Sequence, residues 1–196
     1  MSSRDTYWAA DAESKPAPDP LIRVQELVNT VELPEGPDRL ADPADARPWL
    51  VANGLLTSDA ELQASDLELL RGVREALRAM LVHNAGGPIP TTELAPLREV
   101  ASDGTARADF DDHGEVVLTT AGDSVSARLV ELLLIIRDAQ RDGSWARLKA
   151  CGNGECQWAF YDRSRNHGGT WCEMSSCGNK LKNREFRARK RGVGSH

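Results

Sequence analysis

The chain has 196 residues, of which 40% are hydrophobic and 28% are charged, and this composition suits one medium-sized folded domain with a small appendage. No apolar run approaches the roughly 18 residues that a membrane helix requires, and the N-terminus lacks the apolar core of a signal peptide. Together with a formal net charge of −6, these features exclude a membrane-spanning or wholly disordered chain. We expect a cytoplasmic protein with no membrane partner.

Residues 1–19 are rich in Ser, Asp, Pro and Ala and are expected to form a disordered tail. Asp19-Pro20 then resembles a helix start, with proline at the first helical position. We expect this helix to end near Asn29-Thr30, whose polar side chains either cap the helix or line a pocket; we favour the cap. Its apolar residues recur at helical spacing: Leu21, Val24, Leu27 and Val28.

Three helix-start patterns follow before residue 90. The first predicts a short helix that carries Trp49 and Leu50, and the last predicts a long amphipathic helix that a Gly-Gly-Pro sequence ends. The start patterns are Asp42-Pro43, Ser58 with Glu61, and Ser65 with Glu68. The apolar stripe of the long helix is formed by Leu69, Leu70, Val73, Leu77, Met80 and Leu81.

The second half of this region combines helices with one hairpin. A short helix is expected around residues 94–101, followed by strands at 106–110 and 115–119 that a polar Asp-Asp-His-Gly turn joins. Another long helix then ends before Gly143. Residues 20–145 therefore predict a mostly helical α+β domain. The apolar residues of the last helix are Val125, Leu129, Leu132, Leu133 and Ile136.

All four cysteines lie in the last quarter of the chain, in two C-x4-C pairs separated by fifteen residues: Cys151, Cys156, Cys172 and Cys177. Two close pairs across such a spacer are typical of a metal site. Two disulfides are the alternative, but they persist in oxidising compartments, and no export signal is present. We expect one structural zinc ion with four thiolate ligands and no open coordination position. A module of about 45 residues also needs such a metal to be stable.

The order of elements around the cysteines predicts a small treble-clef-like finger over residues 146–192. Gly152 and Gly154 are free to take positive φ in the first cysteine turn, which would let backbone N–H groups face the sulfur atoms. An aromatic strand at 158–161 should follow. Ser175 or Ser176 is then expected to cap a helix that runs from Cys177 to Arg191.

This last predicted helix is strongly basic, whereas the rest of the chain is acidic. Residues 149–196 hold ten Lys and Arg against four Asp and Glu, and the remainder holds fourteen against twenty-six. Such clustering repels itself unless an anion is near, which favours contact with phosphates over a merely solvated helix face. Arg163 and Arg165 are either further phosphate contacts or loop charges. The helix stripe consists of Lys180, Arg184, Arg187 and Arg191, and Lys182, Arg189 and Lys190 add to its field.

The motifs of this segment resemble the CGNR-type zinc finger. They are Cys151 and Cys156, then Phe-Tyr-Asp-Arg-Ser-Arg-Asn at 160–166, Trp-Cys-Glu-Met at 171–174, and Cys-Gly-Asn-Lys at 177–180. The resemblance implies that the four cysteines bind zinc and that Asn179 and the basic side chains contact nucleic acid. Lys180 stands where the family has arginine, which keeps the charge but loses bidentate geometry. The loop at 166–170 is also less basic than is common in the family.

In that family the finger follows a domain called ABATE, and the two-domain proteins are regarded as stress-induced bacterial transcription regulators. Val-Asn-Thr at 28–30 and Trp-Leu at 49–50 with Gly-Leu-Leu at 54–56 are similar to that domain's patterns, so the resemblance covers residues 21–191.

No catalytic motif is recognisable, and His83, His113 and His167 are interpreted as cap, surface or loop residues rather than as catalytic or metal-binding groups. We therefore expect a regulator, not an enzyme. In this hypothesis the zinc finger binds DNA and the acidic domain senses a small-molecule effector or forms a homodimer. The alternative is an adaptor whose finger binds RNA or an acidic protein. A third hypothesis, an enzyme with the finger as a targeting device, lacks a catalytic group.

Overall fold

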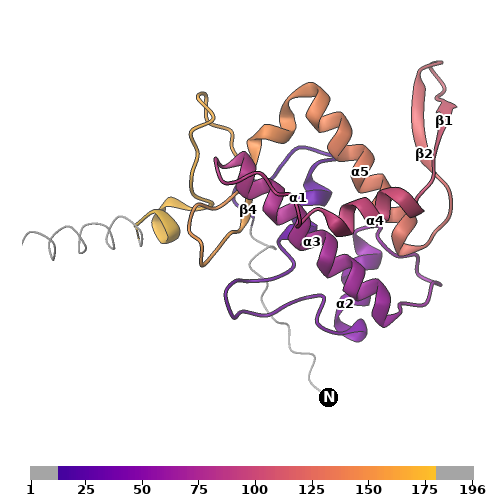
Figure 1. Ribbon diagram of the computed structural model, residues 1–196, viewed down its shortest axis with the longest axis horizontal. Coiled ribbons are helices and arrows are strands. Elements are labelled where there is room, and N and C mark those ends of the chain that lie inside the picture. Colours follow the sequence, from indigo (N-terminus) through magenta and orange to yellow (C-terminus); the bar gives the residue numbers. More distant parts are fainter. Residues whose placement is uncertain (1–12, 180–196) are drawn as a thin grey trace, which may run out of the picture.

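The computed structural model describes residues 13–179 as five α-helices and two short antiparallel hairpins (Figure 1). The helices are α1 (Ile22–Val28), α2 (Pro43–Ala52), α3 (Ala64–Asn84), α4 (Ala95–Asp103) and α5 (Val125–Asp142). The strands are β1 (Ala106–Phe110), β2 (Val116–Thr120), β3 (Leu148–Ala150) and β4 (Ala159–Tyr161). Two short helical turns complete the described part, η2 (Ser144–Arg147) and η3 (Met174–Gly178). The predicted α+β fold class is confirmed.

The long helix α3 runs through the centre of the molecule and contacts α1, α4 and β3 (Figure 1). Its predicted apolar stripe faces the core, where each fully buried Leu contributes about 1.5–3 kcal/mol to folding. Leu69 and Met80 lie at the margin of the stripe and are only partly buried. The fully packed members of the stripe are Leu70, Val73, Leu77 and Leu81.

The helix starts show which local signals determine the fold. Asp42 caps α2 as predicted, because its carboxylate accepts the N–H of Ala44 at 2.8 Å. The two predicted capping boxes are wrong. At the start of α3, the Asp66 carboxylate instead accepts the N–H of Gln63 at 2.9 Å, and Ser65 lies inside the helix. Leu67, in the first turn, is buried.

The predicted β-hairpin is confirmed as β1 and β2, which pair antiparallel and project from one end of the helical body (Figure 1). Every residue of β1 is exposed, and β2 contacts α5. The hairpin is therefore a protruding two-stranded sheet rather than part of the core.

The predicted finger shares its core with the helical domain. Helix α5 ends at Gly143, whose φ of +83° reverses the chain into η2 and β3. Strand β3 packs against α3, so that Leu148, Ala150 and Ala159 lie in the same buried cluster as the helices. No helix among residues 13–179 is long and apolar enough to cross a membrane.

Residues 13–19, predicted to belong to a disordered tail, instead lie along β4. The Lys15 carbonyl accepts the Tyr161 N–H at 2.9 Å, and the Lys15 ammonium donates to the Trp171 carbonyl at 2.6 Å. Ala17 is buried. The prediction of disorder fails for this segment because its backbone accepts a hydrogen bond from the outer edge of β4. The rest of the predicted tail, residues 1–12, lies outside the described residues.

Candidate metal centre

The chain brings the four predicted cysteines together beside the β3–β4 hairpin. Cys151 follows β3, Cys156 precedes β4, and Cys172 and Cys177 lie before and within η3. All four sulfur atoms lie within 4.8 Å of one another, and the Cys156–Cys172 and Cys172–Cys177 sulfur distances are both 3.8 Å. A hairpin turn with two ligands, followed by a helical turn with two more, is the predicted treble-clef-like arrangement.

These distances fit a tetrahedral zinc site and exclude disulfides. A Zn–S bond of about 2.3 Å gives a sulfur–sulfur edge of about 3.8 Å in an ideal tetrahedron. A disulfide would need a separation of about 2.05 Å, and none of the four cysteines is oxidised. The protein therefore binds one structural zinc ion through four thiolates, which leaves no coordination position for water or substrate.

The pKa values of the cysteines reflect how closely their sulfur atoms lie. Hydrogen bonds from the Cys156 and Cys172 thiols lower the pKa of Cys151 to about 2. The same contacts with Cys151 raise the pKa of Cys156 to about 12 and raise that of Cys172 further. One thiolate is thus stabilised at the expense of its neighbours. A divalent ion removes this conflict, because its charge stabilises all four thiolates at once.

The first cysteine turn is held by backbone hydrogen bonds. The Cys151 N–H donates to the Trp158 carbonyl at 2.9 Å, and the Cys156 N–H donates to the Asn153 carbonyl at 2.8 Å. Neither glycine uses its freedom to take positive φ, and Gln157 takes that conformation instead, with φ of +47°.

Gly152 is required for close packing, not for its φ. A Cβ at this position would lie 2.9 Å from Thr170 Cγ2 and 3.1 Å from Trp171 Cζ3. Gly154 has open space around its Cα.

Cys177 lies on a helical turn that begins earlier than predicted, and Cys172 lies just before this turn. The turn starts at Met174, and Ser175 and Ser176 lie inside it, so neither serine is its N-cap. The Ser176 hydroxyl instead donates to the Glu173 carboxylate at 3.0 Å. The Asn179 amide donates to the Ser175 carbonyl at 3.2 Å. The predicted basic residues lie outside the described residues: Lys180, Lys182, Arg184, Arg187, Arg189, Lys190 and Arg191.

A buried ion pair organises the loop between β4 and the second cysteine pair. The Lys149 ammonium lies 2.8 Å from the Asp162 carboxylate, and both side chains are less than a tenth exposed. Burial raises the pKa of Asp162, but hydrogen bonds from Lys149 and Ser164 lower it more, so that its pKa lies well below the ordinary value. The Gly169 N–H donates to the same carboxylate at 2.8 Å, which closes the loop.

The two arginines predicted as phosphate contacts both lie on this loop and are exposed. The Arg163 guanidinium donates to the Pro16 carbonyl at 2.9 Å and lies 5.9 Å from the centre of the Tyr161 ring. Arg165 points its charge to solvent at the edge of the metal module. The cysteine cluster and this loop thus lie on one module.

Helix α1 holds β4 through buried amides that the sequence analysis did not assign to the site. The Asn29 side chain accepts the Ala159 N–H at 2.8 Å and donates to the Ala159 carbonyl at 3.0 Å. The Gln25 amide donates to the same carbonyl at 3.1 Å. Asn29 is the C-cap residue of α1, as the sequence analysis favoured. Its side chain, however, forms hydrogen bonds with Ala159 of β4. The sequence signal that could have revealed this contact was the presence of the polar residues Gln25 and Asn29 among the apolar positions of α1.

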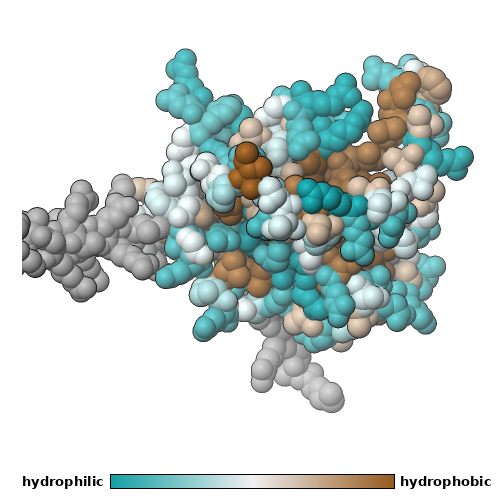
Figure 2. Space-filling view, in the orientation of Figure 1, coloured by the Kyte–Doolittle hydropathy of each residue, from teal (hydrophilic) through white to brown (hydrophobic). Residues whose placement is uncertain are grey.

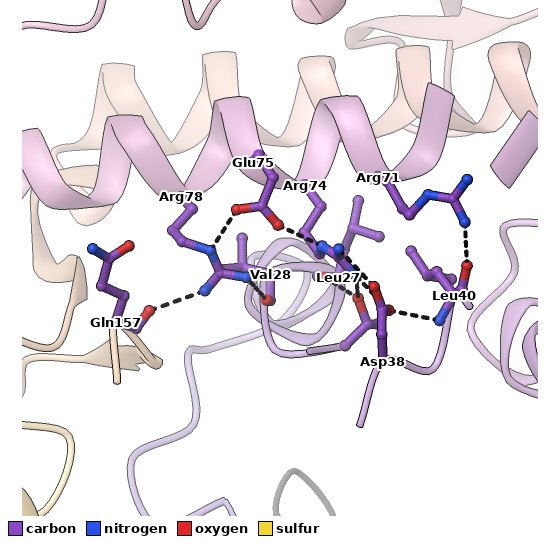
Figure 3. A network of polar contacts seen from close by, with 10 residues as sticks. Leu27, Val28, Asp38, Leu40, Arg71, Arg74, Glu75, Arg78 and Gln157 are labelled. Atoms are coloured by element: carbon purple, nitrogen blue, oxygen red, sulfur yellow. Dashed lines mark hydrogen bonds and ion pairs between the residues drawn. The ribbon is translucent and has the colours of Figure 1, made fainter. Parts of the chain in front are cut away.

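An arginine network joins α3 to the first cysteine turn (Figure 3). The Arg78 guanidinium donates to the Val28 carbonyl at 2.8 Å and to the Gln157 carbonyl at 3.1 Å. Glu75 lies between Arg78 and Arg74 and binds both. The cysteine turn is therefore attached to the central helix at its residue of positive φ.

A cavity of about 440 Å³ opens beside three of the zinc ligands. Its wall is acidic and combines both parts of the chain: Glu13, Glu32 and Glu173 line it together with Cys156, Cys172, Cys177 and Trp158. Among the described residues, no histidine joins the cysteine cluster. His83 is exposed and contacts the Gly87 carbonyl, and His113 is exposed in the hairpin turn.

Two family models match the chain, in the order that the motifs predict. A model described as "Putative stress-induced transcription regulator", ABATE, matches residues 23–141. A model of the CGNR zinc finger matches residues 147–190. Both descriptions are regulatory or metal-binding and neither is enzymatic. No curated protein matches the chain.

Proposed function

Because the chain belongs to the ABATE family and carries a CGNR zinc finger, we propose that it is a transcription regulator that binds DNA through the finger. The observation that carries this proposal is the position of the zinc cluster. Cys177, the last ligand, lies three residues before Lys180, where seven Lys and Arg begin within twelve residues. The basic segment thus follows directly after the last metal ligand in the sequence.

The charge distribution supports a division of labour between the two parts. The acidic helical domain is repelled by a polyanion, so the basic segment alone is suited to meet phosphates. We assign the helical domain to sensing or assembly. A small-molecule effector of that domain would reach the finger at the cavity beside the zinc ligands, because Glu32 and Leu33 of the helical domain form part of its wall.

DNA binding is tested by titrating labelled duplex DNA with the zinc-loaded protein at several salt concentrations. About four phosphate contacts should give a slope of log K against log salt of about −3 to −4. A variant with Lys180, Arg184 and Arg187 changed to alanine should lose most of this slope. The matched control changes three exposed arginines of the helical domain: Arg98, Arg137 and Arg141. Both triple variants remove the same charge, so only the position differs.

Competition with RNA and with acidic proteins distinguishes the adaptor hypothesis. If RNA displaces duplex DNA at equal concentration, or if the salt slope is flat, the regulator proposal fails. A genome-wide occupancy map of the wild type and the basic triple variant provides the test in cells. Discrete sites that disappear in the variant support regulation through the finger, and unchanged occupancy contradicts it.

A further inference from the structure

The β1–β2 hairpin exposes apolar side chains that the rest of the fold leaves uncovered. Phe110, Val116 and Leu118 are 70%, 65% and 37% exposed. Phe110 pairs with Val116, and Ala108 pairs with Leu118, so that these side chains lie on one face of the sheet. Apolar surface extends from the hairpin onto the helical body in Figure 2. Strand β2 is supported by its contact with α5, whereas the exposed strand β1 forms the outer edge of this two-stranded sheet.

The outer edge of β1 has backbone groups available for that partner. The Asp111 N–H donates to the Glu115 carbonyl at 2.9 Å, which makes this pair hydrogen-bonded. Hydrogen-bonded pairs alternate along an antiparallel ladder, so Asp109 and Arg107 also bond to β2. The backbone groups of Ala106, Ala108 and Phe110 therefore point away from β2. The Phe110 N–H is bound by the adjacent Asp109 carboxylate at 2.9 Å, so this carboxylate must release the N–H before Phe110 can pair with another strand.

We propose that this edge binds a second copy of the same chain, so that two β1 strands pair antiparallel about Ala108 and form a four-stranded sheet. In this register Ala108 bonds to its symmetry mate, and Ala106 bonds to Phe110 of the other copy. Arg107 then lies directly opposite Asp109 of the other copy, in a non-hydrogen-bonded pair where side chains approach most closely. The two-fold axis creates this ion pair twice.

The charges of β1 select this register among those that the backbone permits. Bonding between the outward-facing residues allows antiparallel pairing centred on any residue from 106 to 110. The centres that pair at least two of the three outward-facing residues are 107, 108 and 109. A centre at 107 would place Arg107 opposite Arg107, and a centre at 109 would place Asp109 opposite Asp109. Only the centre at Ala108 pairs opposite charges. An edge whose sequence complements itself in this way is suited to a copy of itself.

The position of the hairpin is compatible with this assembly. The hairpin and the metal module lie at opposite ends of the long axis of the molecule (Figure 1). Pairing through β1 therefore leaves both zinc modules accessible. Each Phe110 would also move from solvent to a position beside Ala106 of the other copy, next to the groove lined by Leu118, Thr120 and Ile135.

Sedimentation equilibrium of charge variants of the full zinc-loaded chain tests the interface. Arg107→Asp and Asp109→Arg each place like charges opposite one another, and each should weaken self-association by about tenfold or more. The double variant Arg107→Asp/Asp109→Arg should recover wild-type association. An equimolar mixture of the two single variants should form a heterodimer, because every facing pair then has opposite charge. Arg137→Asp controls for the change in net charge.

The mixture separates the proposal from a simple folding defect, because a hairpin that does not form cannot be rescued by a second variant. The expected result is dimeric wild-type protein, weakened single variants and a restored mixture. A wild type that stays monomeric up to millimolar concentration would overturn the proposal. So would dimerisation that Arg107→Asp leaves unchanged. DNA binding by the finger can persist in either case, so failure here is distinguishable from failure of the proposed function.

Discussion

Replacing Asn29 with alanine should destabilise the protein more than its position at the end of a seven-residue helix suggests. The Ala159 N–H faces away from β3, and its bond to the Asn29 side chain at 2.8 Å occupies it. The variant leaves this buried donor unpaired, at a cost of about 1–3 kcal/mol. The Ala159 carbonyl keeps its bond from Gln25 but loses the one from Asn29, at a cost of about 0.5–1.5 kcal/mol. The sum is roughly 2–4 kcal/mol.

Urea unfolding of the zinc-loaded protein measures this loss as a shift of the midpoint. Asn53→Ala is the matched control, because Asn53 is also the C-cap residue of a helix and donates to the Trp49 carbonyl at 2.8 Å. Its loss leaves no buried N–H unpaired, so the control should lose less than about 1 kcal/mol. If the two variants were destabilised equally, Asn29 would act only as a helix cap, and the bridge from α1 to β4 would contribute nothing.

Three further predictions concern the metal module. A strong chelator should unfold the β3–β4 region, seen as loss of amide protection, and added zinc should restore it, because four close thiolates cannot coexist without the cation. Gly169→Ala should destabilise the chain by about 1–3 kcal/mol in thermal unfolding, because the added Cβ would lie 2.6 Å from the Asp162 carboxylate. Gly154→Ala is the control and should not destabilise the chain, because the space around Gly154 is open. The pKa of Asp162 is lowered in the folded state, so its contribution to stability is present above the ordinary carboxyl range and is lost as pH falls below it. The stability difference between wild type and Asp162→Asn should therefore shrink on acidification, and a constant difference would contradict the ion pair with Lys149.

The sequence predicted the elements whose signals are local. Helical periodicity located α3 and α5, the polar turn located the β1–β2 hairpin, and cysteine spacing located the metal site. Each of these signals depends on residues within one element. The four zinc ligands could be predicted for the same reason, because two close cysteine pairs leave few other ways to arrange a metal site.

The long-range polar contacts could not be predicted from the sequence. Arg78 looked like one charge among many on an amphipathic helix, yet it is 3% exposed and bonds to Gln157, 79 positions away. Lys149 and Asp162 entered the sequence analysis only through the charge balance of residues 149–196, but they form a buried pair. Residues 13–19 carried a composition typical of disorder, which reports on their own side chains and not on the strand edge that they cover. Such contacts depend on which backbone groups the fold leaves unpaired.

The physical connection between helical domain and finger constrains how a regulator of this kind can work. A finger on a flexible linker would bind its target independently of the domain before it. Here the first cysteine turn is bonded to α3 through Arg78, and β4 is bonded to α1 through Asn29. Both helices thus form hydrogen bonds with the β3–β4 hairpin. Because packed cores do not deform continuously, a shift of α1 relative to α3 would break one of these attachments. Displacement of either helix would therefore move the first cysteine turn or β4, and with them the neighbouring ligand Cys156.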